Sequence, residues 1–306
     1  MRLNVWAVSL LVLPLCALRA LCGEPSSLEE RIAPIAKAHK GKIAVAVKGL
    51  RTPDEYYLHA DEPMPTASLI KLAVMVEAYR QAEEGKLSLD KTLTLTKDDK
   101  VPGSGILTPH FSDGATFPLR DAVRLMIVFS DNTATNMVLD QTGIRPVNER
   151  MEKLGLKETR INAKVFKGKT TNVDQERFEK YGLGSTTARE SVRLLELILR
   201  HEAASADDCA RMLDHLKACD DKEKMTRFLP PGAVAAHKTG SITAAKTDAG
   251  IVFVRDPADK KEKPLFVLCV LTDENEDRRW VADNAAQVTI GKIAKAAYDH
   301  FTADKK

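Results

Sequence analysis

Two residues near the start of an apolar, helical stretch have the chemistry of a nucleophile and its base. In the segment PTASLIKLAV, Ser68 and Lys71 are three residues apart, so on a helix they share one face, about one turn from each other. A serine hydroxyl is a poor nucleophile unless a nearby base removes its proton. A lysine among apolar residues is partly desolvated, which lowers its pKa and lets it accept that proton. The pair therefore indicates nucleophilic catalysis by Ser68.

Two further short motifs are needed, because a serine three residues before a lysine is a weak pattern. A second copy, Ser88 and Lys91, follows a glycine in a turn-like stretch, and we interpret it as solvated surface. The chain also contains Ser130-Asp131-Asn132 in FSDNTA and Lys238-Thr239-Gly240 in AAHKTGS. Each tripeptide occurs by chance in roughly one chain in twenty of this size. Together, in this order, the three motifs point to a common site.

Each motif also has a structural interpretation when taken singly. Ser130 alone would be read as the cap of the helix NTATNMVLDQTG, and the Lys238 tripeptide as the end of a strand. His237 precedes Lys238, and because strand side chains alternate, we expect it to pack on the opposite face. The other histidines, His110 and His201 among them, have no aspartate and serine partners in a pattern that indicates a Ser-His-Asp hydrolase.

The three motifs resemble those of the serine penicillin-recognising family, and most closely its class A β-lactamase branch. The resemblance extends over nearly the whole chain after the N-terminal segment and includes KLGLKETRI and STTARE. It implies a serine hydrolase that opens β-lactam rings through an acyl-Ser68 intermediate, without a cofactor or metal. The implied catalytic residues are Ser68, Lys71, Ser130 and Lys238, and the implied substrate-binding residues are Asn132, Thr239, Gly240 and Ser241.

The resemblance also implies a role for each of these groups. Ser130 would pass a proton to the leaving nitrogen, and Asn132 would hydrogen-bond the amide side chain of the substrate. Lys238 would supply positive charge, while Thr239 and Ser241 would bind the substrate carboxylate.

Backbone groups complete the expected site. The N–H groups of Ser68 and Ser241 could form an oxyanion hole. Gly240 would let a substrate backbone lie against the edge of the strand.

The sequence departs from the class A pattern where a deacylating glutamate is expected. In the family this residue follows a stretch like Thr159-Arg160-Ile161, but the matching positions here are near Val165 and Phe166. Glu158 and Asn162 have the right spacing on the wrong side of that stretch, which we interpret as coincidence. Glu176 and Glu179, in a loop that is longer than usual, are weak substitutes and are more typical of solvated loop carboxylates.

A second departure concerns the cation that binds the substrate carboxylate. The segment SITAAKTDAG lacks the arginine of the family, and Lys224, Arg227 or Lys246 could substitute for it.

Two alternative functions stay open. A D-Ala-D-Ala peptidase, or a related amidase or esterase, would use the same nucleophile on cell-wall peptides. A β-lactam-binding domain without turnover is disfavoured because a pure binder does not need the proton-transfer groups Lys71 and Ser130.

The pattern of elements predicts an α/β fold of the α+β type. Five strand candidates, two at the N-terminal end and three at the C-terminal end, would form one antiparallel sheet flanked by N- and C-terminal helices. A mostly helical block would be inserted as an all-α lobe, with the active site between the lobes. We predict an α/β domain from residues 24–62 and 220–306, and an all-α domain from residues 63–219.

The N-terminal segment and the composition indicate where the protein acts and which partners to expect. Residues 1–22 read as a secretory signal peptide, so we expect an exported, periplasmic or secreted protein, with lipidation of Cys22 as a minor alternative. The net charge is +3 over 306 residues, and the basic residues form no stripe, so we expect no nucleic-acid partner. We also expect no membrane span in the mature protein, and a monomer. Cys209, Cys219 and Cys269 show neither a disulfide framework nor zinc spacing.

Overall fold

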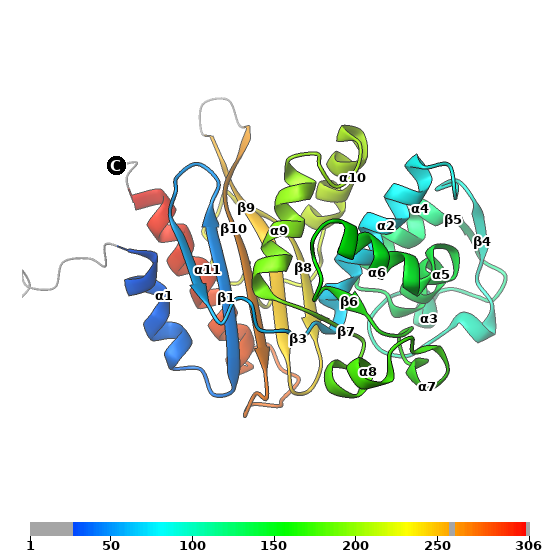
Figure 1. The fold of residues 1–306 in the computed structure, drawn as a ribbon, viewed down its shortest axis with the longest axis horizontal. Helices are drawn as coiled ribbons and strands as arrows, with labels where there is room; N and C mark the ends of the chain where they lie inside the picture. Colours follow the sequence, from blue (N-terminus) through cyan, green and yellow to red (C-terminus); the bar gives the residue numbers. More distant parts are fainter. Residues whose placement is uncertain (1–26, 257–260, 304–306) are drawn as a thin grey trace, which may run out of the picture.

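The computed structural model describes residues 27–256 and 261–303, and the predicted signal peptide with Cys22 lies outside them. At its centre is a five-stranded sheet in the order β2-β1-β10-β9-β8, in which all pairs are antiparallel (Figure 1). Its strands are β1 (Lys42–Gly49), β2 (Glu55–Leu58), β8 (Ala233–Ser241), β9 (Lys246–Arg255) and β10 (Glu262–Asp273). The predicted union of N-terminal and C-terminal strands in one sheet is confirmed.

Two helices from opposite ends of the chain cover one face of this sheet. They are α1 (Leu28–Lys37) and α11 (Ala285–Thr302), which lie side by side in Figure 1. Ser27 caps α1, because its hydroxyl accepts from the backbone of Glu30 while the Glu30 carboxylate accepts from the backbone of Ser27. Ile32 of α1 and Ile290 of α11 pack in the core beneath.

The opposite face of the sheet packs against helices of the inserted block. Helices α9 (Ala188–Leu199) and α10 (Ala206–Lys217) lie on the strands, and the buried α2 (Lys71–Glu83) lies beyond them with α4 (Leu119–Val128), α5 (Asn132–Thr142) and α6 (Ile144–Lys153). Val74 of α2 belongs to the same apolar core as Ala46 and Cys269 of the sheet. The two lobes therefore share a continuous core, and the boundaries at residues 62/63 and 219/220 stay a prediction.

The inserted block is not purely helical. It contains the small sheets β3-β7-β6 and β4-β5, together with several short helices. The bounds are β3 (Met64–Pro65), β4 (Thr92–Thr94), β5 (Thr116–Pro118), β6 (Arg160–Ile161), β7 (Gly184–Thr186), α3 (Leu107–His110), α7 (Gly168–Thr171), α8 (Gln175–Tyr181), and the 3-10 helices η1 (Ala67–Ile70) and η2 (Lys97–Asp99).

Two predicted helices begin differently in the structure. The helix predicted from residue 68 starts as η1 and becomes α-helical only at Lys71. The segment RRWVADNAAQVTIGKIAKAAYDHF predicts a C-terminal helix from residue 278, but α11 begins at Ala285, because Asn284 is its N-cap and its side-chain oxygen accepts from two backbone amides.

The three cysteines outside the N-terminal segment are free and buried, as the spacing of Cys209 and Cys219 predicts. Within the described residues, no helix is both long and apolar enough to cross a bilayer. No group of three or more metal-ligating side chains is assembled in that same part of the chain.

Candidate active site

The proposed nucleophile lies where the central sheet meets the inserted block. Ser68 is in η1, and Lys71 is the first residue of α2, so one continuous helical segment carries both. Ala67 precedes Ser68 with a φ of 47°, a left-handed conformation that is unfavourable for alanine. The tight packing around η1 therefore holds this backbone in a strained geometry, as is common at functional sites.

Lys71 is fully buried and its amine is held by the Ser130-Asp131-Asn132 motif. Its Nζ lies 2.7 Å from the carbonyl oxygen of Ser130, 2.9 Å from Oδ1 of Asn132 and 3.3 Å from Oγ of Ser130. Burial, followed by repulsion from Lys238, holds the pKa of Lys71 well below its ordinary value, and Asp131 opposes this shift only partly. A neutral Lys71 can accept a proton.

The hydroxyl of Ser130 joins the two buried lysines. Its Oγ lies 3.0 Å from Nζ of Lys238, and that ammonium also donates to the carbonyl oxygen of Thr239 at 2.8 Å. Burial lowers the pKa of Lys238, although Cys219 and Asp221 attract its charge. Lys71, Ser130 and Lys238, from three different parts of the sequence, thus form one hydrogen-bonded line.

The structure separates the roles of Ser130 and Asp131. Asp131, not Ser130, is the N-cap of α5, with Oδ1 accepting from the amide of Ala134 at 2.8 Å. Its other oxygen accepts from the amides of Ile106 and Leu107, at 2.7 and 2.8 Å. The capping interpretation of Ser130 is therefore wrong, because Asp131 fills that position and leaves the Ser130 hydroxyl to the lysines.

Asn132 reaches the same site from the first turn of α5. Its Oδ1 accepts from Lys71, while Nδ2 donates to the carbonyl oxygen of Pro102 at 3.0 Å. An amide nitrogen carries two hydrogens, so one donor is left for a substrate. The predicted hydrogen bond to a substrate amide is compatible with this arrangement and stays a prediction.

The edge of strand β8 supplies the second backbone N–H. Ile242 and Ala245 exchange both of their backbone hydrogen bonds, so the next pair along the hairpin, Ser241 and Lys246, is a pair without hydrogen bonds. The N–H of Ser241 therefore points away from β9, off the free edge of the sheet. The N–H of Ser68, in the first turn of η1, has no acceptor within its own helix. Among the described residues, neither predicted oxyanion-hole donor thus has an acceptor, so both can donate to a ligand.

Gly240 has a structural role that the motif did not reveal. A Cβ atom at this position would lie 2.3 Å from the carbonyl oxygen of Thr66 and 2.4 Å from Oγ1 of Thr247. Both contacts lie between β8, β9 and the approach to η1, so only a glycine lets the strand pack this closely on the helix with Ser68. The structure gives a reason for Gly240 that does not depend on substrate, and the predicted backbone contact stays a prediction.

The three cations proposed to replace the family arginine are all engaged elsewhere. Lys224 pairs with Asp221 at 2.5 Å, and Arg227 binds Glu223. Lys246 donates to the carbonyl oxygen of Ile242, and its Nζ lies 3.9 Å from the centre of the Trp280 ring.

None of these three side chains lines the cavity at Ser68 described below. The Lys224 ammonium and the Thr239 hydroxyl do act together on Asp221. Burial opposes ionisation of this carboxyl, but Lys224, the backbone N–H of Glu223 and the Thr239 hydroxyl together outweigh it and lower the pKa of Asp221 to about 2.

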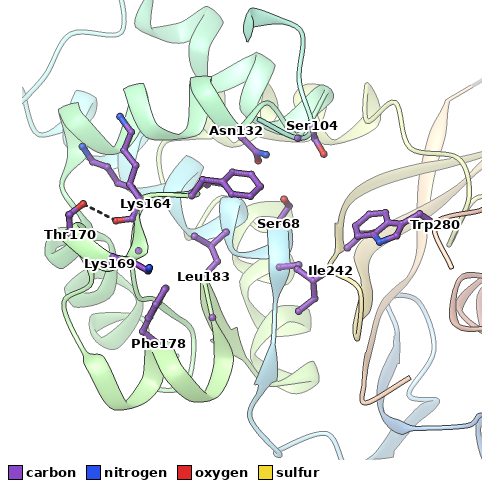
Figure 2. A pocket seen from close by; sticks show the side chains of 18 residues that line it. Ser68, Ser104, Asn132, Lys164, Lys169, Thr170, Phe178, Leu183, Ile242 and Trp280 are labelled. Carbon is purple, nitrogen blue, oxygen red and sulfur yellow. Dashed lines mark hydrogen bonds between the residues drawn. The ribbon is translucent and has the colours of Figure 1, made fainter. Parts of the chain in front are cut away.

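A cavity of about 990 Å³ opens at Ser68 and also contacts Asn132 and Ser241. In Figure 2, Ser68 lies between one wall with Ile242 and Trp280 and another with Leu183, Phe178 and Lys169. Most of this lining is apolar, and the ring of Trp280 is 66% exposed. The cavity is large enough for a drug-sized molecule, which can contact the nucleophile and both oxyanion-hole residues together.

The loop between β6 and β7 faces Ser68 without a carboxylate. The side chain of Asn136 fixes this loop, because it accepts from the amide of Val165 at 2.8 Å and donates to the Val165 carbonyl at 3.0 Å. Val165 and Phe166, the positions near which the class A glutamate is expected, line the cavity. No aspartate or glutamate side chain lines this cavity in the described part of the chain.

The candidate replacements for the missing glutamate lie outside the cavity lining. Glu176 is exposed in the first turn of α8, and Glu179 accepts from Gln175 at 2.6 Å on the surface of the same helix. Glu158 binds Arg177, and the Asn162 side chain donates to backbone carbonyls. The long loop does not fold Glu176 or Glu179 into the site, because α8 presents Phe178 to the cavity instead.

His237 lies outside the cavity lining, as the alternation of strand side chains predicts. Its ring is fully buried, and Nδ1 lies 3.0 Å from the Asp248 carboxylate on the neighbouring strand β9. Burial favours the neutral ring, but Asp248 and Cys219 outweigh it and raise the pKa of His237.

Several cavity residues could not be inferred from the motifs. Lys169, Phe178 and Trp280 belong to loops or short helices without a recognisable pattern. A weak indication was available for Trp280, since a tryptophan in a highly charged segment, DENEDRRW, has no place in a predicted core.

Comparisons with known proteins agree with this geometry. The sequence profile of the Beta-lactamase enzyme family matches residues 27–301. The extended-spectrum β-lactamase PER-1 of Pseudomonas aeruginosa is 24% identical over 281 residues, covering 89% of this chain and 86% of its own. A β-lactamase structure from Sphaerobacter thermophilus superposes with a TM-score of 0.77 at 27% identity, over 90% of this chain and 98% of its own.

A second solved structure, titled PBP-A, has a TM-score of 0.74 at 23% identity, over 90% of this chain and 96% of its own, and shows the shared fold. The arrangement of the three motifs, the fold and the profile match over nearly the whole described chain lead to one assignment. The chain belongs to the β-lactamase enzyme family, as a class A-like serine hydrolase.

Proposed function

We propose that this protein opens β-lactam rings by acylation of Ser68. The observation that carries the proposal is the hydrogen-bonded line from Lys71 through Ser130 to Lys238, beside the cavity at Ser68. A buried amine with a lowered pKa next to a serine is what activation of that serine requires.

The proposed acylation moves one proton from Ser68 to the ring nitrogen. Oγ of Ser68 attacks the lactam carbonyl carbon while neutral Lys71 takes the hydroxyl proton, and the N–H groups of Ser68 and Ser241 stabilise the oxyanion. As the C–N bond breaks, Ser130 gives its proton to the nitrogen and is reprotonated by Lys71. Lys238 holds the Ser130 hydroxyl in place and stabilises negative charge beside it.

We further propose that the acyl-enzyme is hydrolysed slowly. Water must attack the ester, and a positioned general base contributes about 10²–10⁴-fold to such a step. The wall facing Ser68 offers Val165 and Phe166 rather than a carboxylate.

The second candidate function is a D-Ala-D-Ala peptidase with the same nucleophile. The absence of a carboxylate among the described cavity residues favours it. The fold is shared with PBP-A, whose L158E mutant was solved as an acyl-enzyme complex with penicillin G. A binding domain without turnover is disfavoured, because Lys71 and Ser130 are both positioned for proton transfer.

Export and oligomeric state are part of the proposal. We infer secretion from the N-terminal residues 1–22 alone, and we expect the mature protein to act as a monomer on a small β-lactam or a cell-wall peptide.

One kinetic experiment tests the function. The mature protein is mixed with a chromogenic cephalosporin, and both the burst and the steady state are recorded. We expect a burst of about one equivalent, a mass adduct on Ser68 and slow turnover afterwards. A subsequent assay with a D-Ala-D-Ala peptide distinguishes the peptidase. If wild type and Ser68→Ala behave identically, the assignment of the nucleophile is wrong.

A further inference from the structure

The cavity at Ser68 has a positively charged wall that acylation does not use. Lys164, Lys167 and Lys169 contribute to its lining, all from the segment that follows β6. No acidic side chain of the described residues lines the same space. The wall is therefore chemically suited to one sign of charge.

The three lysines differ in how far their charges are neutralised. Lys164 forms an ion pair with Asp140. Lys167 donates to the backbone carbonyl of Asp98 at 2.9 Å, a neutral acceptor. The exposed Lys169 makes neither a hydrogen bond nor an ion pair with any described residue. Two positive charges at the cavity are thus not neutralised by a carboxylate.

The acids of the neighbouring helix α8 do not compensate for these charges. Asp174 caps that helix through the amide of Arg177, and Glu179 is bonded to Gln175. Neither these two residues nor Glu176 lines the cavity. The face that α8 presents is Phe178, whose ring lies beside the backbone of Gly168, where an added Cβ would be 2.1 Å from it.

Apolar surface lies between the nucleophile and the lysines. Leu183 and Phe178 stand on the same wall as Lys169 in Figure 2, on the side of Ser68 opposite to Trp280. A group that enters this part of the cavity meets hydrocarbon and aromatic surface together with ammonium groups. A ligand with both an apolar body and a negative charge matches this surface, because burial of the body and attraction of the charge occur together.

We propose that the enzyme prefers substrates whose acyl side chain combines an aryl or alkyl body with a distal anion, bound by Lys169 and Lys167. The inference rests on the proposed acylation of Ser68, because that reaction places the acyl side chain in this cavity. Such an anion could belong to a β-lactam side chain or to a cell-wall peptide. Lys169 and Lys167 are then specificity-determining residues.

Two isosteric penicillins test the preference. Their side chains are 4-carboxyphenylacetyl and 4-carbamoylphenylacetyl, which differ in charge but hardly in size. At low ionic strength we expect the carboxylate compound to acylate the enzyme about threefold to tenfold more efficiently, the range for one or two partly exposed ion pairs. The ratio should fall towards one in 0.5 M NaCl, because salt screens exposed charges.

Variants assign the effect to the lysines. Lys169→Gln, alone and with Lys167→Gln, should bring the ratio close to one. The matched control is Lys153→Gln, since Lys153 is exposed on α6 of the same lobe and does not line the cavity. This control should keep the wild-type ratio. Equal acylation rates for both penicillins in wild type would overturn the proposal. An unchanged ratio in the variant that carries both Lys169→Gln and Lys167→Gln would overturn it as well.

A binding measurement separates this proposal from the proposed function. Calorimetry with Ser68→Ala gives the ratio of dissociation constants for the two penicillins without any chemistry. If wild type is not acylated but Ser68→Ala still binds the carboxylate penicillin more tightly, the proposed acylation is wrong and the proposed anion site is supported. If wild type is acylated while neither rate nor affinity depends on charge, the anion site is wrong. Tripeptides with and without a free side-chain carboxylate, tested as competitors, decide whether the anion comes from a peptide.

Discussion

The two walls that meet at Ser68 are built in opposite ways. On one wall, Lys71, Ser130 and Lys238 are tied by hydrogen bonds of 3.3 Å or less, and both lysines are fully buried. On the other, the loop from β6 to β7 presents Phe166, which is 66% exposed, and lysines at the surface. The first wall can activate a serine, whereas the second contains no base for water. The difference teaches that acylation and deacylation depend on separate regions and can be altered separately.

The largest effect is expected from Lys71→Ala, which breaks the acylating wall. Acylation should slow by about 10²–10⁴-fold, because the general base is lost. Stopped-flow measurement of the burst with a chromogenic cephalosporin gives the rate, and a thermal melt checks the fold. Normal acylation in a folded variant would refute the base role of Lys71.

The pH dependence of acylation gives the next largest effect. The pKa of Lys71 is lowered by burial and by Lys238, so the amine becomes neutral at a lower pH than an ordinary lysine. Below that pKa it is an ammonium and cannot accept a proton, so acylation should fall about tenfold for each pH unit. Above it the rate should level off. The burst rate measured across pH checks this expectation. The residual acylation of Lys71→Ala should not show the fall at low pH, because the titrating amine is absent.

Val165→Glu sharpens the comparison by placing a carboxylate on the facing wall. Asn136 fixes the backbone of Val165, so the new side chain has a defined starting point in the cavity lining. Deacylation should accelerate by about tenfold or more, at the low end of what a positioned base contributes. The decay of the acyl-enzyme, followed by mass spectrometry, measures it. Val165→Gln is the control, and equal rates for the two variants would show that a missing carboxylate is not the limiting factor.

Asn136→Ala should have the smallest effect on acylation. The amide of Asn136 is buried and makes both bonds to Val165, so its removal leaves two backbone groups without partners. The free energy of unfolding should fall by about 1–3 kcal/mol. Urea denaturation measures the loss, and hydrogen exchange should show faster opening of residues 162–183. A large loss of acylation would mean that the two walls are not independent.

Much of the fold could be predicted from local pattern. The strand KIAVAVKGL and the helix capped by Ser27 follow from side-chain alternation and a capping box, which depend on neighbours in the sequence. The late start of the C-terminal helix could not be predicted, because Asn284 caps it only where residues 277–284 form a turn. The shared core of sheet and helices was also missed, since pattern does not reveal which face meets which.

The sequence by itself determined the chemistry of the site, because Ser68, Lys71, Ser130 and Lys238 stand in short motifs whose residue types carry the reaction. Only the tertiary structure decided what surrounds them. It assigned the cap to Asp131, packed Gly240 against η1, and placed Phe166 and Lys169 in the cavity while Glu176 and Glu179 stayed outside. The physical reason is that these outcomes depend on contacts between segments far apart in the chain.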